Sequence, residues 1–259
     1  MDNYSLKIQG FDSNSSLSLS KVVFDSFTVL NFIEKSDTEI ILKKDFFSED
    51  YKVPNVCRYR LVKTDGEYNL LPNEAKKIYS SAFNDIKIDD EFLEENKLPV
   101  IILILESPHK DEYDYTPNLT PKAPAQGVTG TQICEKFEKI INNHLDELEL
   151  KDTEYRILII NPIPYQTSLY HCHHNTLKNS YKDIRDFVWK TLWEDGGYKS
   201  EFNKLIKKIN PDIIINACTK DLKINIDEIL NIIGVERKYH INHPANWAYT
   251  NGNCNLEVK

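Results

Sequence analysis

The sequence predicts an α/β protein: a three-layer α/β/α domain with a mainly parallel four-stranded central sheet, plus a β-rich N-terminal extension. Apolar runs such as 100–105 (VIILIL) and 155–160 (YRILII) alternate with amphipathic stretches of helical period. An unbroken apolar run is typical of a parallel strand covered on both faces. Strands that alternate with helices indicate βαβ crossovers. We therefore expect an extension over residues 1–97 and the α/β/α domain over residues 98–259.

The extension is expected to be rich in β-structure because its apolar segments are short and separated by turn signals. Residues 1–20 are polar, contain NSSLSLS, and are predicted to be a flexible lead. Residues 22–32 and 39–44 have β character. Residues 57–71 predict a hairpin, because Asp65-Gly66 supplies the positive φ of a tight turn. A short helix over 73–83 follows.

In the second part, strands and helices follow one another with clear end signals. Gly196-Gly197 separates two helices, Pro211 ends the second of them, and Gly234 ends the last helix. The predicted strands are 100–105, 155–160, 212–217 and 235–241. The predicted helices are 129–150, 177–193, 200–209 and 224–233.

Composition excludes several classes. The chain has 259 residues and a net charge of -8, which argues against a non-specific DNA coat because phosphates repel an acidic protein on average. No run approaches the roughly 20 apolar residues of a membrane span, and the first residues lack the pattern of a signal peptide. We therefore expect a cytoplasmic protein. The five cysteines form no CxxC pair, so reduced thiols are expected.

The chemistry-bearing residues gather where the predicted strands end. The four segments that follow the strands are ESPHK (106–110), NPIPYQ (161–166), CTK (218–220) and NHPANW (242–247). Parallel strands bring their carboxyl ends to one edge of the sheet, where α/β proteins place their sites. Histidines, a carboxylate and several amides are expected to converge there.

These segments resemble the motifs of the uracil-DNA glycosylase superfamily, in the same order over about residues 98–250. LESPH is similar to the GEAPG motif of its thermophilic branch, with Glu106 and Pro108 at the matching positions. HPANW is similar to the HPSPL motif, with His243 and Pro244 matching. Asn161 matches the asparagine that recognises the base.

The resemblance implies a monofunctional DNA glycosylase that needs no cofactor and binds DNA with a flipped-out base. It implies catalytic roles for Glu106, Asn161 and His243. Trp247 falls at the position of a minor-groove wedge, and APAQGVTGTQI resembles the glycine loop that opens a helix. The residues that it places around the substrate are Ser107, Pro108, His109, Gly127, Gly130, Tyr165, Gln166, Asn246 and Trp247.

The departures from the motifs bear on specificity. Ser107 stands where the most active branch has an aspartate that activates water, and His109 where that branch has a tyrosine that excludes 5-substituted pyrimidines. Leu105 replaces the leading glycine. The chain lacks the closely spaced cysteines that hold an iron–sulfur cluster in the thermophilic branch. A modified pyrimidine therefore suits the pattern better than uracil, in DNA repair or in defence against phages.

Each candidate also has a structural explanation. Glu106 could cap a helix or pair with Lys110, and Trp247 could belong to the core. The run 171–174 (HCHH) has residue types that bind zinc, but adjacent ligands rarely close around one metal, so no metal is expected. Lys110, Lys122 and Lys220 either form a basic rim or are solvated surface residues.

Two further functions stay open. A hydrolase of free nucleosides or nucleotides fits the acidic charge, because a small substrate needs no basic groove. A non-catalytic module that senses a base or nucleotide fits the replacement of the aspartate by Ser107. In each case we expect a monomer with no membrane partner.

Overall fold

The computed structural model describes residues 3–11, 16–20, 32–73, 86–88, 92, 98–114, 119–170, 181–250 and 254–259. The chain divides into two compact units and passes repeatedly between them. Unit 1 holds residues 1–53, 107–122 and 163–199, and unit 2 holds residues 54–106, 123–162 and 200–259. This division differs from the expected boundary between residues 97 and 98.

Unit 2 is built on one mixed sheet of eight strands, in the order β14-β13-β12-β8-β11-β5-β6, with β7 paired to β5. The strands are β5 (Val56–Thr64), β6 (Glu67–Pro72), β7 (Ile86–Lys87), β8 (Val100–Ile104), β11 (Glu154–Ile160), β12 (Ile213–Asn216), β13 (Lys238–His240) and β14 (Glu257–Val258). The protein is thus of mixed α/β class with a large sheet.

The four expected strands lie side by side in this sheet. β8 is parallel to both β11 and β12, and β12 is parallel to β13. The sheet continues with antiparallel strands on both sides, because β5 pairs with β11 and β14 pairs with β13. The expected four strands are therefore half of a larger mixed sheet.

The hairpin expected over residues 57–71 is confirmed, but it belongs to this sheet. β5 and β6 pair from Tyr59 and Pro72 to Thr64 and Glu67. Asp65 and Gly66 have φ angles of 53° and 93°, the left-handed conformations that a tight hairpin turn requires. Because β5 joins β11, the hairpin extends the parallel strands and does not form a separate extension.

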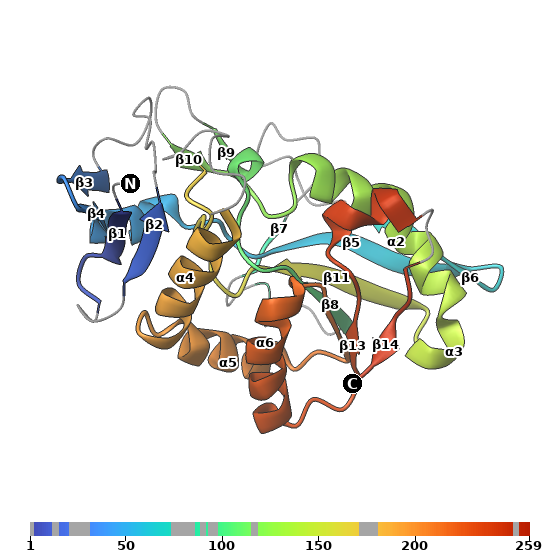
Figure 1. Cartoon of the computed structure of the whole chain (residues 1–259). Coiled ribbons are helices and arrows are strands. Elements are labelled where there is room, and N and C mark those ends of the chain that lie inside the picture. Colours follow the sequence, from blue (N-terminus) through green and yellow to red (C-terminus); the bar gives the residue numbers. More distant parts are fainter. Residues whose placement is uncertain are drawn as a thin grey trace. The chain divides into compact units, whose positions relative to one another are not determined.

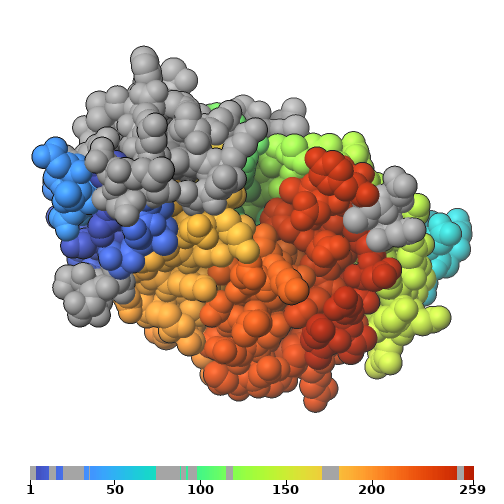
Figure 2. All heavy atoms as spheres, viewed as in Figure 1, coloured from blue at the N-terminus to red at the C-terminus, as the bar shows by residue number. Residues whose placement is uncertain are grey.

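Helices lie on both sides of the sheet of unit 2. Figure 1 shows α5 and α6 on one side, and α2 and α3 on the other. The helices are α2 (Gly127–Asn143), α3 (Leu145–Leu148), α5 (Tyr198–Ile209), most of which belongs to unit 2, α6 (Lys220–Ile233) and the 3-10 helix η6 (Pro244–Thr250). In the space-filling view, orange and red segments that include α6 and η6 form much of the near surface (Figure 2).

Burial of the strands follows from this cover. Residues 101–104 of β8 are fully buried, so both faces of that strand are shielded from water. One face packs Leu103 into a cluster with Ile133 and Phe137 of α2 and with Trp247 of η6. A strand buried on both faces is the arrangement that its apolar sequence predicts.

The largest differences from the predicted helix boundaries occur at the end of α2 and at the start of α6. The helix expected over 129–150 is broken at His144, and α3 closes on Glu149, which adopts a left-handed φ of 45°. α6 begins at Lys220, four residues earlier than expected, with Thr219 as its N-cap. Its end at Gly234, with a φ of 81°, is as expected.

Unit 1 contains a second sheet of four strands, in the order β2-β1-β4-β3. The prediction of a flexible lead over residues 1–20 is wrong where the structure describes it, because β1 and β2 form there. Leu6 and Leu19 alternate with polar residues, which buries them on one face with Ile40 of β4. The other elements of unit 1 are short, apart from one helix. The elements are β1 (Asn3–Ile8), β2 (Leu17–Ser20), β3 (Ile33–Lys35), β4 (Glu39–Leu42), η2 (Lys44–Phe47), η3 (Glu49–Tyr51), η4 (Lys110–Glu112), β9 (Tyr113–Asp114), β10 (Thr120–Pro121) and α4 (Tyr181–Glu194).

Three predicted segments fall wholly or largely outside the described residues. They are the strand over 22–32, the short helix over 73–83 and the first residues of the helix over 177–193. In the part of the chain that the structure describes, we find no helix that combines the length and the apolar character needed to cross a membrane.

Candidate active site

The candidate site of unit 2 is the edge where the four parallel strands end. Hydrogen bonds continue the ladder just past the strands: the Leu105 N–H donates to the Ile160 carbonyl, and the Ala217 N–H to the Ile104 carbonyl, both at 2.9 Å. Neighbouring strands lie about 4.8 Å apart, so the loops after β13, β12, β8 and β11 leave within about 14 Å of one another. A ligand the size of one nucleotide can reach several of them.

Glu106 follows β8 and is buried, with 8% of its surface exposed. Its Oε2 accepts a hydrogen bond from the backbone N–H of Thr219 at 3.2 Å. Since Thr219 is the N-cap of α6, the carboxylate lies at the positive end of that helix, which stabilises a negative charge. The structure thus gives Glu106 a contact with a helix start and a fixed orientation at the strand ends.

Asn161 follows β11, the strand next to β8. The residue is buried, with 3% exposed, and its backbone N–H donates to the Oδ1 of Asn55 at 3.0 Å. Glu106 lies two residues after the last paired residue of β8, and Asn161 one residue after that of β11, and these two strands are adjacent and parallel. A buried carboxyl and a buried amide thus follow neighbouring strands of the sheet.

His243 is half-buried and lies in the loop after β13. Its Nδ1 accepts a hydrogen bond from the Ala245 N–H at 3.3 Å, and its carbonyl accepts from the Asn246 N–H at 2.9 Å. A neutral imidazole that accepts at Nδ1 carries its proton on Nε2. The turn therefore selects the tautomer that can donate from Nε2. Asn246, in the same turn, is exposed.

Trp247 lies in the core. It is fully buried, its ring stacks on Phe137 with centroids 6.3 Å apart, and its Nε1 donates to the Asn242 carbonyl at 2.7 Å. The Nζ of Lys136 donates to the Trp247 carbonyl at 2.7 Å. A residue that inserts into a DNA groove must be exposed, so the buried Trp247 does not fit the role of a wedge.

An exposed aromatic side chain does occur nearby, at Tyr249. It lies in η6, two residues after Trp247, and 86% of its surface is exposed. The motif comparison missed Tyr249 because the matched segment ends at Trp247. The only available signal was a second aromatic residue close behind the motif.

Gly130 lies where the chain packs against itself. A Cβ at this position would be 2.0 Å from the carbonyl oxygen of Ala125. Arg58, which is buried, donates to the same carbonyl at 2.7 Å and also to the carbonyl of Pro124. Gly130 thus lets the loop fold onto the first turn of α2. Gly127 begins α2 with a left-handed φ of 61°.

The residues directly after Glu106 belong to unit 1. The Ser107 hydroxyl is 2.8 Å from the Thr167 hydroxyl, and Pro108 is buried. His109 caps η4, with its Nδ1 3.2 Å from an Asp111 carboxylate oxygen. Burial lowers the pKa of His109, and the neighbouring Asp111 partly offsets this effect.

Tyr165 and Gln166 are also in unit 1, and both are buried. The Tyr165 ring makes edge contacts with Phe47 and Tyr198, with centroids 5.5 and 5.8 Å apart. Tyr165 therefore packs in an aromatic cluster. The Lys110 ammonium lies 4.4 Å from the ring centroid of Tyr170.

The run 171–174, which has zinc-binding residue types, lies outside the described residues. Among the residues that are described, no group of three or more His, Cys, Asp or Glu side chains is arranged to hold a metal ion. Four cysteines have free thiols in the structure: Cys57, Cys134, Cys218 and Cys254.

No protein-family model matches the chain, and neither a curated protein nor a solved structure matches it. The resemblance to the uracil-DNA glycosylase superfamily therefore depends on the motifs and on the places they occupy in the fold.

Proposed function

We propose that the chain is a monofunctional DNA glycosylase that releases a pyrimidine, with a modified base a better fit than uracil. The observation that carries this proposal is the position of Glu106 and Asn161. Two buried polar side chains follow adjacent parallel strands, at the edge where α/β sheets form their sites. His243 follows a third strand that ends at the same edge.

The proposal includes the fold of the superfamily. In it, the parallel strands β13, β12, β8 and β11 form the middle layer of an α/β/α domain, and β5–β7 and β14 are additions to that layer. The spatial order of the four strands supports this idea. The helices on both sides of the sheet support it as well (Figure 1).

Glu106 is proposed to act on the sugar. When the bond between C1′ and the base nitrogen breaks, the electron pair leaves with the base and positive charge develops on the sugar. Water then forms the new bond at C1′, and its proton passes to solvent or to the departing base. A carboxylate held by the Thr219 N–H can stabilise that cation or orient the water.

Asn161 and His243 are proposed to act on the base. The amide of Asn161 offers a donor and an acceptor that match the edge of a pyrimidine. The Nε2–H of His243 can donate to the base oxygen that gains negative charge as the bond breaks. The turn at Ala245 supports this role because it selects the required tautomer.

Tyr249 is proposed to contact the DNA in place of Trp247. A base must leave the duplex to reach Glu106 and Asn161, at a cost of a few kcal/mol, which an aromatic ring recovers in part by stacking. Tyr249 is exposed and lies in η6, which directly follows His243.

The test is incubation with duplex and single-stranded DNA that carries a panel of pyrimidine modifications, followed by detection of abasic sites. Wild-type protein is expected to release at least one base. Glu106→Gln and His243→Ala are expected to lose this activity while retaining the wild-type circular dichroism spectrum. Wild-type activity in both variants would reject the assigned roles.

Two other outcomes would replace the proposal. Release of bases from free nucleosides, without abasic sites in DNA, would indicate a nucleoside hydrolase. Binding of the modified DNA or of nucleotides without any base release would indicate a binding module.

A further inference from the structure

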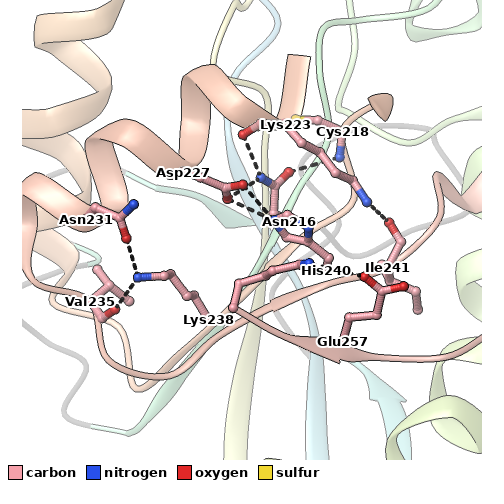
Figure 3. A network of polar contacts seen from close by, with 11 residues as sticks. Asn216, Cys218, Lys223, Asp227, Asn231, Val235, Lys238, His240, Ile241 and Glu257 are labelled. Carbon is pink, nitrogen blue, oxygen red and sulfur yellow. Dashed lines mark hydrogen bonds and ion pairs between the residues drawn. The ribbon is translucent and has the colours of Figure 1, made fainter. Parts of the chain in front are cut away.

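A network of polar side chains connects α6 to the ends of β12 and β13 (Figure 3). Asn216, the last residue of β12, is fully buried. Its Oδ1 accepts from the Cys218 N–H at 3.1 Å, and its Nδ2 donates to Asp227 of α6, also at 3.1 Å. Buried polar groups that are hydrogen-bonded in this way fix one arrangement of the elements they join.

Asp227 extends the network to β13. Its Oδ2 lies 2.8 Å from the Nε2 of His240, the last residue of that strand. The carboxylate thus joins the ends of two adjacent strands, one through Asn216 and one through His240. Thr219 and His243 each lie three residues after these strand ends.

Lys223 contacts the backbone just before His243. Its Nζ donates to the backbone carbonyl of Ile241 at 2.5 Å, and Ile241 precedes His243 by two residues. Burial lowers the pKa of Lys223, while the charges of Cys218, Glu257 and Asp227 oppose that shift and the ammonium of Lys259 adds to it. Figure 3 shows the Lys223 side chain extending from α6 to this carbonyl.

The contact between Lys223 and Ile241 lies where the backbone changes direction after β13. The Ile241 N–H still donates to the Asn216 carbonyl, at 3.2 Å, as a last ladder bond. Beyond it, the chain turns into η6. Among the described residues, the Ile241 carbonyl is therefore the last backbone group before His243 that accepts a hydrogen bond from a side chain of α6.

We propose that Lys223 is a positioning residue for His243: by holding the Ile241 carbonyl, it fixes the turn in which the Ala245 N–H selects the imidazole tautomer. The kinetic consequence rests on the proposed glycosylase function. The consequence for the imidazole does not, because it is a property of the protein without DNA.

The test compares Lys223→Met, which removes the donor, with Lys223→Arg, which retains one. Lys204→Met, at an exposed position of α5, is the matched control. The readout is the ¹⁵N spectrum of the His243 ring in the full-length protein, in which the two tautomers have different shifts. Wild type, Lys204→Met and Lys223→Arg are expected to show mainly the Nε2–H form, and Lys223→Met a mixture of both forms.

The second readout is base release from the substrate that the DNA panel identifies. Lys223→Met is expected to lower kcat at least tenfold with little change in KM, because binding groups elsewhere are unaltered. Lys223→Arg is expected to recover most of this loss. If wild type releases no base, the glycosylase proposal fails, while the ring spectrum still decides the role of Lys223.

An unchanged His243 spectrum in Lys223→Met would overturn the proposal, even if the melting temperature fell. That result would leave Lys223 as a contact that only attaches α6 to the sheet. If Lys223→Met does not fold, Lys223→Gln takes its place, since the shorter amide does not reach the carbonyl.

Discussion

At the scale of single residues, the strand ends of unit 2 combine the candidate chemistry with structural contacts. Glu106 accepts a bond from the start of α6, and His243 accepts one from its own turn. Such contacts orient a side chain before a substrate arrives, which is the condition for electrostatic catalysis. Gly130 and Trp247, by contrast, lie in packed parts of unit 2, Gly130 close to the Ala125 carbonyl and Trp247 stacked on Phe137.

Gly130→Ala is expected to destabilise the protein by about 1–3 kcal/mol, the usual cost of overpacking. The added Cβ would fall 2.0 Å from the Ala125 carbonyl oxygen, so the loop held by Arg58 must move. Urea unfolding measures the change. Val128→Ala, at an exposed position of the same turn, should change stability by less than about 0.5 kcal/mol. Equal effects of the two substitutions would contradict this interpretation.

The two aromatic residues of η6 are expected to respond differently to substitution. Trp247→Ala removes a fully buried ring and should cost about 3–5 kcal/mol of stability. Tyr249→Ala removes an exposed ring and should change stability by less than about 0.5 kcal/mol. It should, however, slow base release from duplex DNA more than from single strands, because only the duplex requires a base to leave the stack. Equal rates on duplex DNA for wild type and Tyr249→Ala would count against a DNA contact.

At the scale of elements, apolar runs identified three of the four parallel strands, β8, β11 and β12, while the fourth, β13, was expected over 235–241 although most of its residues are polar. The sequence pattern could not assign the hairpin β5–β6 to the same sheet, because pairing partners far apart in sequence leave no periodic signal. The antiparallel contact of β5 with β11 gives β11 a neighbour on each side. Without β5, an apolar strand would form the edge of the sheet.

A fragment of residues 98–259 is therefore expected not to fold. It lacks β5 and β6, which removes Tyr59, Leu61 and Tyr68 from the core of unit 2. An exposed apolar edge strand promotes aggregation. Size-exclusion chromatography and circular dichroism of the fragment and of the full chain test this expectation. A soluble fragment with cooperative thermal unfolding would show that the boundary expected at residue 97 is a real one.

At the scale of the whole molecule, the chain builds each unit from three separate segments. The motif LESPH is divided by this arrangement, since Glu106 ends a segment of unit 2 and Ser107 begins one of unit 1. Buried groups in both units contribute to the stability of the protein. Where such a group titrates, the stability of the protein depends on pH.

Tyr113 of unit 1 is expected to make the protein less stable at high pH. Burial, and then the charge of Glu112, raise the pKa of Tyr113 above its usual value of about 10. The folded state therefore keeps a proton that the unfolded chain loses, so stability is complete below about pH 10 and falls as the pH rises further. Urea unfolding between pH 8 and 11 should show this fall.

Tyr113→Phe should reduce the fall, because the substituted side chain has no proton to lose. Burial also raises the pKa of Tyr68, and the lowered pKa of Lys223 acts in the opposite direction, so the difference between wild type and the variant is the quantity to compare. An identical pH dependence of the two proteins would contradict the assignment to Tyr113.

The sequence by itself determined the local features: the apolar strands, the turn at Asp65-Gly66, the stop at Gly234 and the polar residues that follow each strand. These features depend on neighbours in the chain, through periodicity and backbone conformation. Only the tertiary structure decided that Trp247 is core while Tyr249 is exposed. It also decided that Lys223 reaches the Ile241 carbonyl and that β5 completes the sheet, because burial and distant pairing depend on which segments meet in space.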